Sequence, residues 1–193
     1  MDILLKRAVF LLATVPFSLL LIRVQQNNFG PDPAQALSIE TGEWALRFLL
    51  ITLALTPLSQ LTGDARFVRQ RRMLGLFAFF YASVHFLSWM AFILVFRWLA
   101  IGEELLERPY ITIGFAAYLI ISALGITSTR GMVRRLGKNW KRLHKLIYLA
   151  AVLALIHLLW ILRTDIQEFV FYGGVLIVLL GYRVFRKLNV VKR

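Results

Sequence analysis

Six long stretches of this 193-residue chain are almost free of charged side chains, and they limit its fold more than any other feature. Residues 74–96, for example, form a run of 23 residues without a single charge. A membrane-spanning helix needs about 20 apolar residues, and hydrocarbon offers no partner to an open backbone. The sequence therefore predicts an all-α membrane protein, a six-transmembrane-helix bundle. The predicted spans are residues 8–22, 44–61, 74–96, 111–128, 146–162 and 169–182.

The first stretch also has features of a secretory signal peptide. It follows Lys6 and Arg7, it is short, and it contains Pro16. A signal peptide ends at a cleavage site of small residues, but Ile22 is followed by Arg-Val-Gln-Gln. We therefore expect residues 8–22 to stay in the protein as a helix.

Charge is distributed very unevenly between the two sets of loops. One set holds 18 Lys and Arg against two acids, and the other holds five Arg against eight acids. Loops rich in Lys and Arg stay in the cytoplasm, so both chain termini are predicted to be cytoplasmic. The basic set comprises residues 1–7, 62–73, 129–145 and 183–193.

Composition excludes several classes of protein. A formal charge of +13 is typical of proteins that bind nucleic acid or a membrane surface. With 59% hydrophobic residues, the lipid bilayer is the expected partner and nucleic acid is not. The chain has no cysteine, so a disulfide, a thiolate metal site and covalently attached haem are all excluded. We find no repeat or linker, and residues 1–193 are expected to form one domain.

Two of the three histidines are predicted to lie at one depth in the membrane. His85 is the midpoint of residues 74–96, and His157 lies within residues 146–162. Both are eleven residues from the cytoplasmic end of a helix that runs the same way, which is about 17 Å at 1.5 Å per residue. Ionisable groups inside lipid are usually functional, and neutral imidazole ligates iron. If the two helices face each other, His85 and His157 are the predicted axial ligands of one haem.

His144 has no such partner. It precedes His157 by 13 residues and lies about 20 Å lower. The positions at the same level in the third span hold Arg71 and Arg72, which do not ligate iron. His144 is thus either a ligand of a second haem or another cofactor, or a residue of the cytoplasmic loop.

A basic and aromatic segment precedes His144, at residues 137–145. One interpretation is ordinary cytoplasmic charge that binds anionic lipid. The other is a flavin or quinone site, or a docking site for an electron donor. Its candidate contacts are Arg71, Arg72, Lys138, Trp140 and Arg142. Arg47, early in the second span, is either a haem-propionate contact or an interfacial arginine whose side chain reaches the membrane surface.

Four segments carry a resemblance to a known family. They are residues 42–47 (GEWALR), 55–58 (LTPL), 71–76 (RRMLGL) and 137–149 (GKNWKRLHKLIYL). With the histidine pattern, they resemble the ferric-reductase-like transmembrane domains of NADPH oxidases. They are more similar to the MsrQ family, the haem-binding membrane subunits of bacterial MsrPQ methionine sulfoxide reductase systems.

This resemblance implies a function. Such proteins sit in the bacterial inner membrane, carry b-type haem and are associated with FMN. They take electrons from the quinone pool or a cytoplasmic flavin reductase and pass them to MsrP, a periplasmic molybdopterin enzyme that repairs oxidised methionine. The family's haem histidines correspond to His85, His144 and His157. Arg71 stands where the oxidases have another haem ligand. The resemblance therefore does not decide whether His144 binds a second haem or another cofactor.

The sequence therefore predicts an electron-transfer subunit rather than a complete enzyme. It would carry electrons from the cytoplasm to a periplasmic methionine sulfoxide reductase. The alternatives are a cytochrome b561-type protein or ferric reductase, and a non-redox transporter or structural subunit whose histidines bridge helices.

Overall fold

The structure is a computed structural model that describes residues 2–161 and 166–191, and every regular element in these ranges is helical. Six helical segments are long and apolar enough to cross a membrane, which confirms the predicted fold class. The main helices are α1 (Asp2–Gln25), α2 (Pro33–Thr62), α3 (Arg66–Ser88), α5 (Pro109–Ile126), α8 (Ile147–Ile161) and α9 (Ile166–Val191). The short elements are η1 (Trp89–Ile93), α4 (Ala100–Glu107), α6 (Arg130–Leu136), α7 (Lys138–Leu143) and η2 (His144–Leu146).

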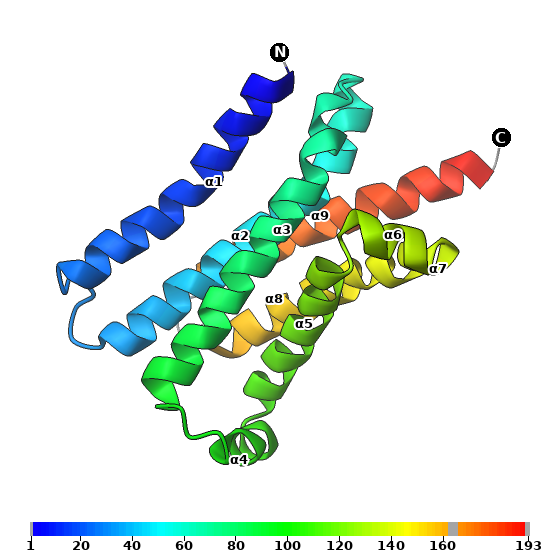
Figure 1. Ribbon diagram of the computed structural model, residues 1–193. Coiled ribbons are helices and arrows are strands. Elements are labelled where there is room, and N and C mark those ends of the chain that lie inside the picture. The colour runs from blue at the N-terminus through cyan, green and yellow to red at the C-terminus, as the bar shows by residue number, and fades with distance from the viewer. Residues whose placement is uncertain (1, 162–165, 192–193) are drawn as a thin grey trace.

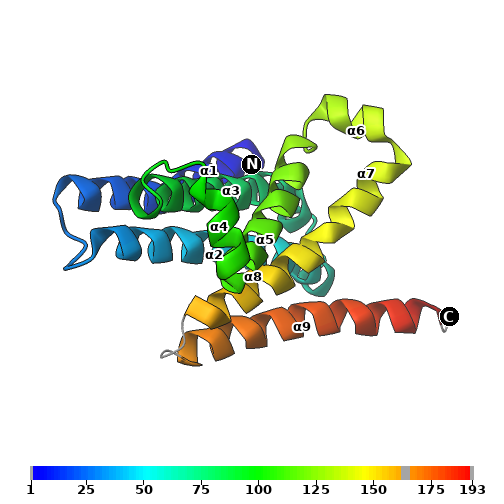
Figure 2. The same cartoon turned by 90° about the horizontal axis from the view of Figure 1, so that it is seen from below.

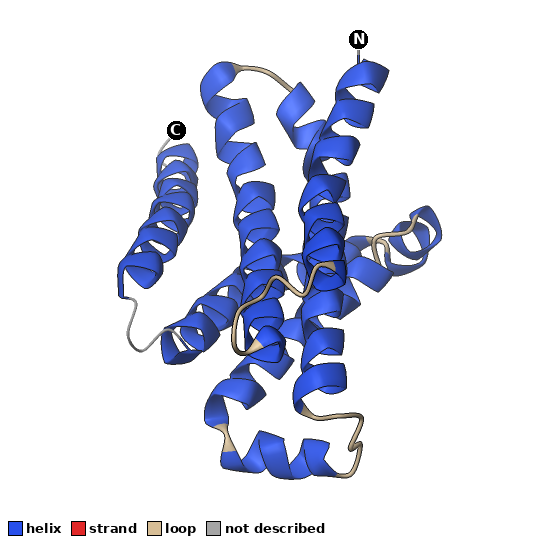
Figure 3. Ribbon diagram, turned by 90° about the vertical axis from the view of Figure 1, so that its left-hand side faces the viewer, coloured by secondary structure: helices blue, strands red, loops and turns tan. Residues whose placement is uncertain are grey.

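Two helical hairpins form the centre of the bundle (Figure 1). α2 packs along α3, α5 packs along α8, and contacts between α3 and α5 join the two pairs. α9 packs against α8 and α2, whereas α1 packs on α3, so these helices lie on opposite sides of the bundle (Figure 2). Loops are short and lie at the helix ends (Figure 3). The short α4 lies at the end of the bundle opposite the N-terminus and the α2–α3 turn (Figure 1).

The helices extend beyond the uncharged stretches that predicted them. α2 begins at Pro33 because the Asp32 side chain accepts a hydrogen bond from the Gln35 backbone N–H at 3.0 Å, a typical N-terminal cap. It ends at Thr62, because the next residue, Gly63, adopts a left-handed conformation with φ 71°. The added turns of α2 at its two ends contain polar residues such as Gln35 and Thr62, which a helix accommodates, so hydropathy alone places the helix ends too far inside.

The predicted end of the third span is wrong. We expected that span to continue to Phe96, but α3 ends at Ser88 and is followed by the π-helical turn η1. Val95 and Phe96 then adopt positive φ angles of 52° and 53°. This conformation is costly for side chains with a Cβ. An uncharged run indicates an apolar environment, and it does not show where a helix stops. The predicted end of the fifth span, Leu162, lies outside the described residues.

α1 is held to α3 by a tyrosine hydroxyl inserted beside a proline. The Tyr81 hydroxyl donates to the Ala13 carbonyl at 2.8 Å and accepts from the Phe17 backbone N–H at 3.0 Å. Those two backbone groups would otherwise bond to each other, but Pro16 lies between them and disturbs the helix there. Tyr81 is completely buried and stacks on Phe48 at 4.9 Å. The segment 8–22 is thus a helix packed on the bundle.

The outer faces of the bundle carry many exposed apolar side chains. Leu4, Leu12, Ile177 and Val178, on α1 and α9, are each 69–73% exposed. Apolar patches of this extent are unusual on soluble proteins. They are expected where a helix faces lipid, which agrees with the predicted membrane location.

Candidate cofactor site

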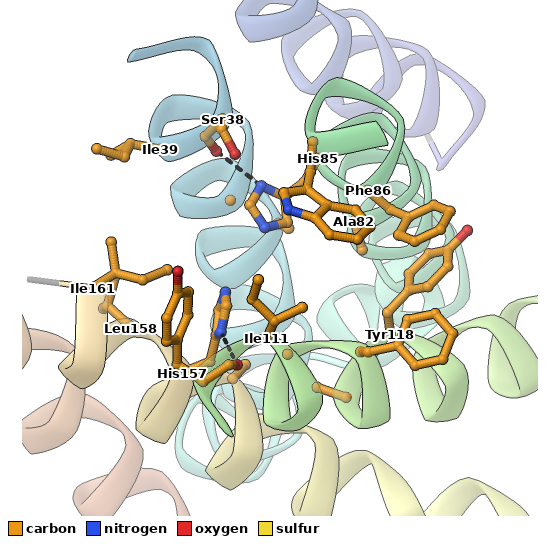
Figure 4. Close-up of a pocket in the computed structure, with 18 of the residues that line it drawn as sticks. Ser38, Ile39, Ala82, His85, Phe86, Ile111, Tyr118, His157, Leu158 and Ile161 are labelled. Carbon is orange, nitrogen blue, oxygen red and sulfur yellow. Dashed lines mark hydrogen bonds between the residues drawn. The ribbon is translucent and has the colours of Figure 1, made fainter. Parts of the chain in front are cut away.

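The structure brings His85 of α3 and His157 of α8 together. The centres of their rings lie 6.1 Å apart, with the ring planes at 71°, and Figure 4 shows the two side chains pointing into the same cavity. The prediction that the two histidines share one haem required their helices to face each other. They do so across the space left by the α2–α3 and α5–α8 pairs.

The separation of the two rings matches that of two axial ligands. An imidazole nitrogen lies about 2 Å from a bound metal and about 1 Å from its own ring centre, so two opposite ligands have ring centres about 6 Å apart. The observed 6.1 Å therefore leaves room for one metal ion between His85 and His157.

Hydrogen bonds set the tautomer of both rings. The Nδ1 atom of His85 lies 2.8 Å from the Ser38 carbonyl oxygen, and Nδ1 of His157 lies 2.7 Å from the Tyr110 carbonyl oxygen. A carbonyl oxygen can only accept, so each Nδ1 carries the proton and donates. In a neutral ring, Nε2 then keeps its lone pair. Metal-binding histidines are oriented by this kind of outer hydrogen bond.

Each histidine also lies against a glycine on the neighbouring helix. A Cβ at Gly42 would lie 3.1 Å from the His85 ring, and a Cβ at Gly114 would lie 2.7 Å from the His157 ring. Gly42 follows Ser38 by four residues and precedes His85 by 43. Gly114 has the same spacing from Tyr110 and His157. The two hairpins thus hold their histidines in the same way.

The cavity between the histidines has a volume of about 910 Å³, within the roughly 300–1,000 Å³ typical of cofactor pockets. Its wall is mostly apolar and aromatic. Phe86 and Tyr118 stack at 4.7 Å on one side (Figure 4). The inner part is lined by apolar side chains, which include Leu49, Ile121 and Ala154. Such a lining suits a large planar cofactor that is mostly apolar.

The number of ligands that the protein offers to a metal limits the type of cofactor that fits between the two histidines. In residues 2–161 and 166–191, no group of three or more His, Cys, Asp or Glu could hold a metal ion. Two imidazoles alone complete a metal site only if the cofactor supplies the other ligands. A haem does so through its porphyrin nitrogens. The residues present therefore fit a haem with two histidine ligands.

His144 lies away from this cavity. Its Nε2 is 3.2 Å from the Thr127 hydroxyl oxygen, and its ring stacks on Trp140 at 3.9 Å. The Thr127 hydroxyl donates to the Ala123 carbonyl at 2.6 Å, so His144 Nε2 is the donor in the remaining contact. His144 thus has the opposite tautomer to His85 and His157. Trp140 also donates its Nε1–H to the Thr127 carbonyl at 3.0 Å.

The other predicted contact residues lie on two different parts of the bundle. Arg71 lies within electrostatic range of His144 and of Arg183. The remaining candidates of the basic loops, Arg72, Lys138 and Arg142, are exposed. Arg47 is elsewhere, on α2.

The side chain of Arg47 is already occupied by protein groups. It pairs with Glu43 at 2.7 Å and donates to the Tyr172 hydroxyl at 2.9 Å. Its guanidinium also lies 4.8 Å from the centre of the Trp44 ring. The residue lies beside the cavity, and it is not among the residues that line it.

Sequence reasoning missed five residues of this site. The Ser38 and Tyr110 carbonyls, Gly42, Gly114 and Arg108, which lines the cavity, were not singled out. A glycine inside an apolar helix is a signal of close packing and would have drawn attention to Gly42 and Gly114. Nothing local distinguishes the two carbonyls.

Comparison with known proteins agrees with this geometry. Residues 41–155 match the family described as ferric reductase like transmembrane component. A protein-methionine-sulfoxide reductase heme-binding subunit MsrQ from Xanthomonas euvesicatoria pv. vesicatoria is 56% identical over 160 residues, 83% of this chain and 73% of the relative. The protein of the same name from Bordetella pertussis is 41% identical over 181 residues, 93% of this chain and 88% of the relative.

Proposed function

Because the chain belongs to the MsrQ family of heme-binding subunits of protein-methionine-sulfoxide reductase, we propose that His85 and His157 are the axial ligands of a b-type haem. The observation that carries this proposal is the 6.1 Å separation of two rings whose Nδ1 atoms are both bonded to backbone carbonyls. Bound haem supplies a centre that accepts and gives up one electron at a time.

The residues around the histidines favour electron transfer over oxygen chemistry. Two histidines leave the iron no open position for a further ligand. The Ser38 and Tyr110 carbonyls hold both rings in place, so the ligands need not reorganise when the charge changes. The apolar wall keeps water away from the centre.

We propose that electrons cross the inner membrane from the cytoplasm to the periplasm. The loop charges support cytoplasmic termini, with the basic loops on that side. The donor is a quinol or a cytoplasmic flavin reductase. The cluster of His144, Trp140 and Arg71 lies on the donor side and is the candidate site for FMN, a quinone or a second haem.

On the opposite side we propose docking of the catalytic subunit, a periplasmic molybdopterin enzyme of the MsrP type. The support is the exposed surface of α4 and of Leu99 just before it. There Leu99 and Leu106, which are 99% and 87% exposed, lie with the exposed acids Glu103 and Glu107. A helix that rests on anionic lipid carries Lys and Arg on its polar face. The acidic and apolar surface of α4 suits a protein with a basic rim instead.

The test is transfer of electrons from the protein to the catalytic subunit. The chain is expressed with ample haem, purified, reduced with a stoichiometric amount of dithionite and desalted without oxygen. Adding the catalytic subunit of the same bacterium with methionine sulfoxide should reoxidise the haem, and His157→Ala should carry no electrons. A protein that contains no haem, or a haem that stays reduced, would overturn the proposal.

The role of His144 is decided by the same preparations. Haem and flavin are extracted and counted per chain in the wild type and in His144→Ala. If His144 binds a second cofactor, the variant loses that haem or flavin and keeps the haem of His85 and His157. Equal counts in both proteins would show that His144 serves the loop structure only.

A further inference from the structure

In the described ranges, three charged side chains line the cavity, and the one between α4 and α5, Arg108, is half exposed, so we take this side as the mouth of the cavity. Asp32, Glu43 and Arg108 line the cavity, and Arg108 is the one cation that does so within the described residues. The two acids already have partners. Asp32 caps α2, and Glu43 pairs with Arg47. Among the described residues, Arg108 is therefore the one cationic side chain that the cavity wall presents to an anionic ligand.

Arg108 is held at the mouth by its own neighbours. Its Nε pairs with Glu104 Oε2 at 3.3 Å, and its side chain is 48% exposed. A hydrogen bond with the Tyr110 side chain, together with Glu104, holds the pKa of Arg108 above its ordinary value, so it stays charged. A guanidinium has five N–H donors in a planar fork. The ion pair with Glu104 and the hydrogen bond with Tyr110 leave further N–H donors of this fork for a second carboxylate.

The backbone links Arg108 to the histidine ligand. Arg108 is extended, with φ −121° and ψ 90°, and it immediately precedes Pro109, the first residue of α5. Two residues later, the Tyr110 carbonyl accepts the hydrogen bond from His157 Nδ1. The turn that orients the ligand ring therefore also positions the guanidinium.

Apart from Arg108, the described residues that line the cavity offer a carboxylate no cationic partner. Leu49, Ile121 and Ala154 line its inner part, where an unpaired carboxylate would be very costly. Haem has two carboxylates on one edge of an otherwise apolar ring. That edge must face the mouth of the cavity.

We propose that Arg108 binds a propionate of the haem held between His85 and His157, so that the polar edge of the cofactor faces α4. This inference rests on the proposed function, because it requires haem between these two histidines. It also places the carboxylate edge at the side of the protein where the electron leaves. Arg108, rather than Arg47, is then the propionate contact.

The test compares two porphyrins that differ only in their carboxylates. The full-length protein without haem is titrated with haem and with haem dimethyl ester, whose propionates are neutral. The proteins are the wild type, Arg108→Gln and a matched control, Arg97→Gln. Arg97 is an exposed arginine of the same outer segment and does not line the cavity.

We expect Arg108→Gln to weaken haem binding about tenfold or more, the size of a charge-assisted hydrogen bond, and to leave binding of the ester unchanged. Arg97→Gln should bind both as the wild type does. If Arg108→Gln weakens both porphyrins equally, or neither, the assignment is wrong. If Arg108→Gln does not fold, Arg108→Lys is tested in its place. It keeps the charge, so it should still prefer haem over the ester, and loss of that preference also contradicts the assignment.

Different results of this experiment would overturn the proposed function and the role of Arg108. If neither porphyrin gives the spectrum of a haem with two histidine ligands in the wild type, the haem site itself is wrong. If both do and Arg108→Gln does not distinguish them, only the role of Arg108 is overturned.

Discussion

Adding a single methyl group at Gly114 tests how closely α5 must approach the His157 ring. The Cβ of an alanine there would lie 2.7 Å from both Cε1 and Nδ1 of His157. At Gly42 the corresponding distance to His85 is 3.1 Å. The two substitutions are chemically identical, so their difference depends on the distance to the ring.

The magnitude follows from those distances. Non-bonded carbon atoms prefer about 3.5–4.0 Å, so the His157 ring must move by about 0.8 Å, against about 0.4 Å for His85. Metal–ligand distances tolerate about 0.2 Å, and the Tyr110 carbonyl holds Nδ1 of His157 at 2.7 Å. Loss of such an outer hydrogen bond lowers metal affinity about 10–100-fold. We expect that loss in Gly114→Ala and a smaller one in Gly42→Ala.

The assay is a titration of the protein with haem, in which binding is measured from the absorbance of the Soret band. Alanine favours a helix over glycine by about 1 kcal/mol, so α5 should form at least as well in the variant. Gly174→Ala in α9, where a Cβ would meet nothing within 4 Å, is the control and should bind haem normally. Unchanged haem affinity in Gly114→Ala would refute the argument from close packing.

Two further predictions concern the fold and its orientation. Tyr81→Phe leaves the Ala13 carbonyl and the Phe17 N–H without their shared hydroxyl, so thermal unfolding in detergent should show a loss of about 1–3 kcal/mol; an unchanged melting temperature would contradict this. The chain has no cysteine, so labelling of a single introduced cysteine shows on which side of the membrane that residue lies. In intact spheroplasts, a membrane-impermeant maleimide should label Gly102→Cys in α4 and should not label Gly131→Cys in α6; the reverse pattern would invert the proposed orientation.

The depth of the two histidines was predictable because it depends only on helix rise. Counting eleven residues from each cytoplasmic end placed His85 and His157 level, and the structure has their rings 6.1 Å apart. The same counting separated His144 from the pair. These inferences needed no knowledge of which helices are neighbours.

The parts that sequence reasoning missed depend on helix rotation and neighbour choice. Gly42 and Gly114 matter because α2 and α5 lie directly against α3 and α8. In the sequence, Arg108 is one of several charges in a loop, and only the packing of α4 and α5 shows that it lines the cavity. The end of α3 also escaped prediction, because an uncharged run continues through the turn at Val95 and Phe96.

The central claim is that His85 and His157 share one haem iron. It is tested most directly by haem content and the visible spectrum of four purified proteins, the wild type and the alanine variants of His85, His157 and His144. We predict a low-spin haem with two histidine ligands in the wild type and in His144→Ala, and its loss in both His85→Ala and His157→Ala. Full haem content with an unaltered spectrum in either of the last two variants would contradict the account.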